Sequence, residues 1–170
     1  MPDKGLLLRF RHWYQHEKEV HAKVLASLET VPRDRRSESS YGKALDLFAH
    51  MLAARRMWLF RMGRTDGGAT REEEIFPTGA TLAELHTEDA EVATLWTDYL
   101  ESLDHDEVGR VFTYTAFEGD RFTNTVEDIL TQLHGHSWYH RGQIASLVRS
   151  LGGEPAVTDY VYWTRRPVAD

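Results

Sequence analysis

Apolar residues recur at helical spacing in four long segments of the chain. They repeat at intervals of three or four residues, which places their side chains on one face of an α-helix. The segments run from about Leu6 to Leu28, Ser40 to Met62, Leu82 to Leu103 and Thr125 to Leu151. Because each helix has to bury its apolar stripe against neighbours, the pattern predicts an all-α fold, a four-helix bundle.

Capping signals mark the ends of two of these helices. Thr81 and Glu84 have the spacing of a capping box at the start of the third helix, and Asn124 and Glu127 are placed to cap the fourth. The Gly-Gly-Glu-Pro stretch at 152–155 follows the fourth helix. Its glycines supply a left-handed position and its proline blocks continuation, so the helix is expected to end there.

Two stretches between the helices depart from helical spacing. Residues 64–77 are rich in Gly, Thr and Glu and indicate a long connection, whose length allows a crossover in place of strict up-and-down order. Residues 111–117 alternate β-branched and aromatic side chains, a turn signal follows, and 121–124 can form a return strand. The pattern therefore predicts a short β-hairpin before the last helix of the bundle.

Length and charge narrow the picture further. The chain has 170 residues, 41% of them hydrophobic, so residues 1–170 are expected to form one domain with a sizeable core. The apolar tail at 157–163 is expected to dock on the bundle. A formal net charge of -7 argues against a nucleic-acid partner, which needs clustered Lys and Arg. We interpret the basic pair Arg55 and Arg56 as part of a solvated helix face.

Neither a membrane span nor a signal peptide is apparent. No apolar run approaches the roughly 18 residues that a span needs. Residues 1–5 lack a basic region followed by a long apolar stretch and a small-residue cleavage site. A cytoplasmic location without membrane partners is therefore the expectation.

The chain contains no cysteine and nine histidines. The missing cysteines exclude disulfides, thiolate nucleophiles of the protein itself and zinc–thiolate sites. Any metal site in this chain has to use His, Asp or Glu, so the positions of the histidines become the main question.

His136 and His140 fall within the apolar arc of the fourth predicted helix. They are four residues apart, so their side chains lie on adjacent turns, roughly 6 Å apart, and can reach one metal ion. Two neutral rings buried separately would need partners for all their ring nitrogens in an apolar environment, whereas a shared metal satisfies two of these nitrogens at once. Hydrogen-bonded structural histidines are the alternative.

A third ligand has to come from another helix, and His50 is the best candidate. It lies at the edge of the apolar arc of the second helix, where an exposed flank histidine is the alternative. His134 lies well round the helix from His136 and is not expected to share its metal. His12 and His16 lie on a mostly polar face of the first helix. Solvated or structural roles are expected for His12, His16, His21, His86, His105 and His134.

The stretch 136–144, with the pattern H-x-x-x-H-R-G-Q, resembles the DinB-like (damage-inducible) family of metal-binding four-helix-bundle proteins. The resemblance covers nearly the whole chain in order. An aromatic-rich first helix precedes Phe48-Ala49-His50, Trp58 follows eight residues after His50, and Leu151-Gly152-Gly153 closes the last helix. The resemblance implies a three-histidine site for a divalent metal, carried here onto His50, His136 and His140. It also implies a homodimer and, as in some relatives, a small cellular thiol as cosubstrate.

Three imidazoles leave coordination positions open, as in catalytic rather than closed structural metal sites. Imidazole suits several transition metals, among which zinc and nickel are the expected ones. A thiol bound to the metal would ionise and could attack a small electrophilic substrate, the chemistry of a metal-dependent S-transferase or isomerase. Because the protein has no thiol of its own, the nucleophile must be supplied.

Two other functions are compatible with the same ligands. A metal-dependent hydrolase would use bound water and a general base, for which Asp46 and Glu17 are candidates whose position relative to the metal the sequence does not define. A stress-related bundle could instead bind metal without catalysis. No residue is assigned as catalytic: on an ideal helix Arg141 points away from the histidine pair, whereas Gln143 lies closer and could orient a ligand.

Overall fold

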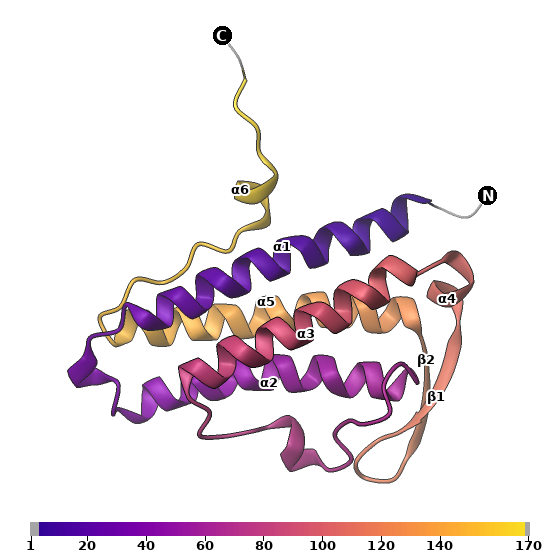
Figure 1. Ribbon diagram of the computed structural model, residues 1–170, viewed down its shortest axis with the longest axis horizontal. Coiled ribbons are helices and arrows are strands. Elements are labelled where there is room, and N and C mark those ends of the chain that lie inside the picture. The colour runs from indigo at the N-terminus through magenta and orange to yellow at the C-terminus, as the bar shows by residue number, and fades with distance from the viewer. Residues whose placement is uncertain (1–3, 169–170) are drawn as a thin grey trace.

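The computed structural model describes residues 4–168, which form a bundle of four long helices with a small hairpin at one end (Figure 1). The four long helices are α1 (Lys4–Glu29), α2 (Ser39–Arg61), α3 (Leu82–Ser102) and α5 (Val126–Ser150). The short elements are η1 (Arg33–Arg35), η2 (Glu72–Ile75), α4 (His105–Gly109), α6 (Tyr160–Thr164), β1 (Val111–Thr115) and β2 (Arg121–Thr125). The predicted four-helix bundle is confirmed.

The connection between α2 and α3 is a crossover, as predicted. It runs back along the bundle, so α3 starts at the end where α2 started and the two helices are parallel (Figure 1). Helices α1 and α2 each pack against both α3 and α5. Consequently α1 and α2 face each other across the core, where Trp96, Phe48, Leu25 and Leu52 are completely or almost completely buried.

The hairpin leads directly into α5. Strands β1 and β2 pair in antiparallel register, with Val111 opposite Thr125 and Thr115 opposite Arg121. Gly119 occupies the turn with a φ of 96°, which a residue with a side chain rarely adopts. The predicted hairpin is therefore confirmed, and the last residue of its second strand is also the N-cap of α5.

Two helix boundaries differ from the sequence-based prediction. Thr125 and Asp128 form the capping box of α5, in place of Asn124 and Glu127. Asn124 is still a strand residue, and its side chain accepts a hydrogen bond from Tyr114. The third helix also ends slightly early, because Asp104 caps the separate one-turn helix α4.

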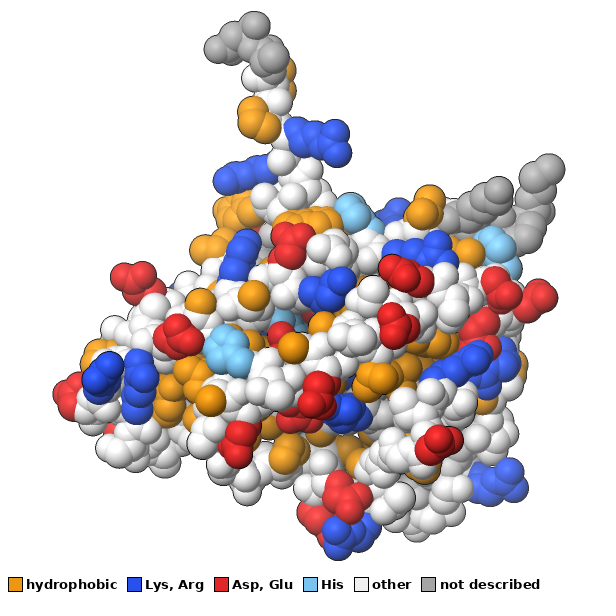
Figure 2. All heavy atoms as spheres, viewed as in Figure 1, with side chains coloured by type: hydrophobic (Ala, Val, Ile, Leu, Met, Phe, Trp, Pro, Cys, Tyr) orange, Lys and Arg blue, Asp and Glu red, His pale blue; other side chains and the backbone are white. Residues whose placement is uncertain are grey.

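The C-terminal segment crosses α1 and then leaves the bundle (Figure 1). Tyr160 bonds the Nδ1 atom of His12 through its hydroxyl at 2.9 Å, and the Trp163 indole donates to Glu19 at 2.6 Å. Hydrophobic side chains gather where this segment meets the bundle (Figure 2). Val161 and Tyr162 of α6 are exposed. The tail thus docks as expected. Among residues 4–168, no helix is both long enough and apolar enough to cross a membrane.

Candidate metal centre

Three histidine side chains converge between α2 and α5. The Nε2 atom of His136 lies 3.1 Å from that of His50 and 3.1 Å from that of His140. In the described part of the chain, these three residues are the group whose ligand atoms can hold a metal ion, all within 4.8 Å of one another. His50 is 8% exposed, and the other two are half-buried.

The structure also shows how two of these imidazoles are oriented. The Nδ1 atom of His50 lies within hydrogen-bond distance of the carbonyl oxygen of Ile75, and that of His140 lies 2.7 Å from Oε1 of Gln143. Both oxygens accept hydrogen bonds, so each Nδ1 atom carries the proton. In each ring the Nε2 atom is therefore left with a lone pair, and it is Nε2 that faces His136.

This arrangement fits a divalent cation better than it fits a group of hydrogen-bonded histidines. A proton on the Nε2 atom of His136 can be shared well with only one of its two neighbours, whereas a cation accepts lone pairs from all three rings. Metal-ligating histidines commonly donate their second N–H to a carbonyl or a side chain, as His50 and His140 do here.

The crossover connection holds His50 in place. Besides the hydrogen bond to Ile75, the ring of Phe76 stacks on the imidazole of His50, with centroids 4.5 Å apart and planes 5° from parallel. Both residues lie in the long connection that returns along the bundle. A connection that the sequence indicates only as a long loop therefore orients one of the three candidate ligands.

Burial favours the neutral form of the His136 and His140 imidazoles. It lowers the pKa of His136 to about 4, with further lowering by the charges that His140 and His50 would carry. Burial also lowers the pKa of His140, and the bond to Gln143 partly opposes this effect. Since metal binding requires neutral imidazoles, protons compete less well here than at free histidines.

We therefore expect metal to be retained further into acid than ordinary imidazoles would allow. Ligands with an unperturbed pKa of about 6.5 would release metal below roughly pH 6. Because the pKa of His136 is about 4, metal release should begin near pH 6 and extend down toward about pH 4. Metal retention after dialysis at stepped pH measures this, with circular dichroism recorded in parallel to detect unfolding. Complete release from folded protein by about pH 6, as ordinary imidazoles would allow, would contradict the expectation.

Gln143 should strengthen metal binding without touching the ion. We expect Gln143→Leu to weaken metal affinity by about 10- to 100-fold, because His140 loses the acceptor that orients it. Gln143→Glu retains an oxygen acceptor and is the matched control. Competition with a chromophoric chelator measures the affinities, and equal affinities for the two variants would exclude an orienting role.

The other histidines lie elsewhere. His134 stacks on Trp13, with ring centroids 4.3 Å apart, and so faces α1, away from the metal ligands as predicted. His21 bonds Asp89 at 2.8 Å. The placement of His16 on a mostly polar face needs correction, because His16 is completely buried. Tyr160 and Trp163 of the docked tail cover its ring, a contact that helix periodicity does not reveal.

A buried charge cluster next to the metal centre was not predicted. Glu17 on α1 pairs with Arg55 on α2 across the core, and Ser137 on α5 donates to Glu17 at 3.1 Å. Arg55 is only 4% exposed, so its assignment to a solvated face was wrong. Its guanidinium lies between the rings of Tyr14 and Trp96, whose centroids are 5.0 and 4.9 Å away.

Burial by itself would raise the pKa of the Glu17 carboxyl. The positive charges of Arg55, His21 and Arg141, together with the hydrogen bond from Arg55, outweigh that effect and lower the pKa below its usual value. Burial lowers the pKa of Arg141 to about 10, and Glu17 opposes this shift. Both side chains are therefore charged at neutral pH. The cluster contributes charge inside the bundle, but its contacts are separate from those of the three histidines.

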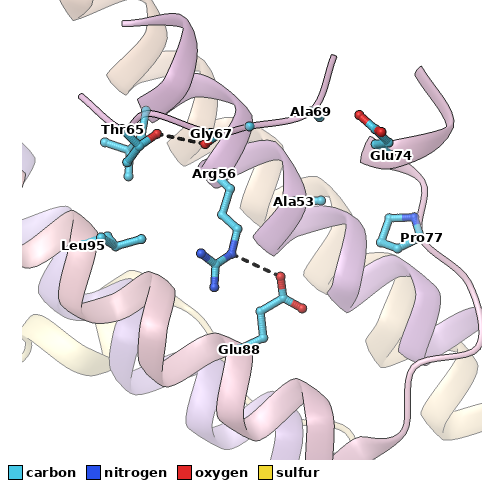
Figure 3. Close-up of a pocket in the computed structure, with 11 residues that line it drawn as sticks. Ala53, Arg56, Thr65, Gly67, Ala69, Glu74, Pro77, Glu88 and Leu95 are labelled. Atoms are coloured by element: carbon cyan, nitrogen blue, oxygen red, sulfur yellow. Dashed lines mark hydrogen bonds and ion pairs between the residues drawn. The ribbon is translucent and has the colours of Figure 1, made fainter. Parts of the chain in front are cut away.

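The crossover also borders a cavity of about 380 Å³ between α2 and α3. Arg56 lies in this cavity and donates to Glu88, as Figure 3 shows, and it also bonds Glu91. None of the three clustered histidines lines the cavity. Glu74 and Pro77 face it from the same connection whose Ile75 and Phe76 contact His50. The loop therefore separates this cavity from the candidate metal centre.

No curated protein matches the chain. A family model, that of the DinB family, matches residues 1–166, which include all four long helices and the three clustered histidines. The chain therefore belongs to the DinB family.

Proposed function

We propose that this protein binds one divalent transition metal through His50, His136 and His140 and uses a low-molecular-weight thiol to attack a small electrophile. The observation that carries the proposal is the convergence of three Nε2 atoms. The Nδ1 atoms of His50 and His140 donate instead to the Ile75 carbonyl and to Oε1 of Gln143. Three neutral nitrogen ligands of this kind suit a catalytic metal with an open position. Zinc and nickel are the metals we expect there.

A metal in this position would favour the ionised form of a thiol that binds to it. The protein's own residues supply the orientation of the ligands: the Ile75 carbonyl holds His50, and Gln143 holds His140. The chain contains no cysteine, so the nucleophilic sulfur would have to come from a cosubstrate.

Contacts of the two candidate bases favour this chemistry over hydrolysis by metal-bound water. Glu17 is paired with Arg55 and accepts a hydrogen bond from Ser137, so its carboxylate is occupied in the core. Asp46 accepts a hydrogen bond from the backbone N–H of Gly79. Neither side chain is directed by these contacts toward the histidine cluster, whereas a supplied thiolate needs no protein base once it is ionised.

Thiol conjugation is the test of this function. We expect metal-loaded protein to conjugate a chromogenic electrophile with at least one cellular thiol faster than free metal and thiol do, and His50→Ala to reduce the rate to that background. His86→Ala is the matched control, because His86 is exposed and pairs with Glu29. Rates are measured by absorbance across a panel of thiols and electrophiles, each with zinc and with nickel.

Rates equal to the background for every thiol would contradict the S-transferase proposal and favour a bundle that binds metal without catalysis. Metal-dependent ester or amide hydrolysis without thiol would favour the hydrolase instead. A cytoplasmic location and assembly as a homodimer belong to the same proposal, and the homodimer rests on the family resemblance.

A further inference from the structure

Arg141 occupies an unusual place in the H-x-x-x-H-R-G-Q stretch. It is 2% exposed, yet its Nε and Nη1 atoms have no hydrogen-bond partner. His140 on the preceding position faces His50 of α2. Arg141 instead interacts with the charges of Glu17 and His16 on α1 and lines a cavity with the C-terminal tail. Buried polar atoms are nearly always bonded to protein, water or an ion, so two unpartnered buried nitrogens of one guanidinium indicate a group that binds there.

The charges around Arg141 favour an anion over water alone. In the buried cluster, one carboxylate, that of Glu17, faces two guanidinium groups, those of Arg55 and Arg141. Arg55 takes the direct ion pair with Glu17. His21 lies 3.6 Å from Glu17 but pairs more closely with Asp89, at 2.8 Å, so any charge on His21 is offset by Asp89. One buried positive charge is left without a direct counter-charge, and water can fill the hydrogen bonds but cannot neutralise that charge.

A cavity lies beside this guanidinium. Its volume is about 460 Å³, and it lies between α5 and the docked tail. Arg141, Trp138, Tyr160 and Val161 line it, with Asp159 at the exposed edge. The walls thus combine one buried cation with aromatic and aliphatic surfaces, as binding sites for small organic molecules do.

His16 adds further polar atoms under the same tail. It is completely buried, and neither ring nitrogen has a hydrogen-bond partner in proper geometry, although the backbone of Thr158 lies close. Tyr160 packs edge-on against its ring, at a centroid distance of 5.1 Å. Two unpartnered buried side chains, one from α1 and one from α5, therefore meet beneath the segment that closes the cavity.

We propose that the cavity between α5 and the C-terminal tail binds a small organic carboxylate, held by the guanidinium of Arg141 with its apolar part against Trp138, Tyr160 and Val161. The guanidinium is planar and matches a carboxylate with parallel N–H bonds. None of the three clustered histidines lines this cavity, so the site is separate from the candidate metal centre. It is independent of the thiol chemistry proposed above.

Calorimetric titration of the metal-free chain with benzoate tests the proposal, with neutral benzamide and inorganic phosphate in parallel. We expect saturable binding of benzoate at least about tenfold tighter than that of benzamide or phosphate, a difference of about 1.4 kcal/mol. Because Arg141 is buried, the variants are placed at the exposed edge. Val161→Glu should abolish benzoate binding, whereas the isosteric neutral Val161→Gln should retain it, and Asp159→Asn should strengthen it.

Binding should also survive in His50→Ala, which separates this site from carboxylate binding at the histidine cluster. Benzoate and benzamide binding equally, phosphate binding in place of benzoate, identical behaviour of Val161→Glu and Val161→Gln, or loss of binding in His50→Ala would each overturn the proposal. None of these results would bear on the thiol conjugation assay.

Discussion

Replacing His136 or His140 with alanine should reduce metal content from about one ion per chain to near zero, whereas His134→Ala should leave it almost unchanged. The three residues lie on the same helix within two turns. Only His136 and His140 direct Nε2 atoms to the cluster with His50, and His134 stacks on Trp13 instead. Loss of a direct ligand should lower metal affinity by more than the factor of about 10 to 100 that is typical for residues that only orient ligands.

Elemental analysis of each variant after exposure to excess zinc or nickel and desalting measures this effect. Circular dichroism confirms that each variant is folded. Full metal occupancy in both His136→Ala and His140→Ala would show that the ion binds elsewhere. Equal loss in His134→Ala would indicate that metal content follows the stability of α5 and not the ligand set.

Glu17→Gln should lower the free energy of unfolding by about 3–5 kcal/mol, the cost of removing one partner from a buried ion pair. Glu17 is 1% exposed, and its neutralisation would leave both Arg55 and Arg141 charged in the core without a carboxylate. The glutamine has nearly the same shape, so the change removes charge and leaves packing largely intact. Denaturant unfolding followed by circular dichroism measures the difference.

The neighbouring pair on α2 supplies a matched control. Arg56 pairs with Glu88, and the side chains are 33% and 36% exposed. Glu88→Gln should therefore cost at most about 1 kcal/mol, as is usual for solvent-exposed pairs. If the two glutamine variants had the same free energy of unfolding, the Glu17–Arg55 pair would contribute no more to stability than a surface ion pair. The charge balance inferred for the core would then be wrong.

The same carboxylate makes stability depend on pH. The pKa of Glu17 is lowered in the folded protein, so the unfolded chain binds the proton more readily. The stability contributed by this group is present above its unfolded pKa and is lost as the pH falls through the folded one. Burial lowers the pKa of His134 from 6.5 to about 4 in the folded protein. The free energy of unfolding should therefore also decrease as the pH falls below 6.5, because the unfolded chain takes up this proton first.

The spacing of apolar residues was sufficient to predict the four long helices, because a helix with one buried face carries that spacing wherever its partners lie. It also determined that His136 and His140 share a face and that His134 does not, because the angle between positions on one helix depends on local geometry alone. The hairpin followed from its alternating pattern and turn, and the crossover from the length of the 64–77 connection.

The tertiary structure decided which faces meet. The register of α2 against α5 brings His50 to the histidine pair, and the returning loop places Ile75 and Phe76 on it. Arg55 and Arg56 are adjacent in sequence, yet one is buried against Glu17 and the other lies at the surface. Such contacts join residues far apart in the chain, and their geometry depends on how whole helices and the tail pack, which no local pattern encodes.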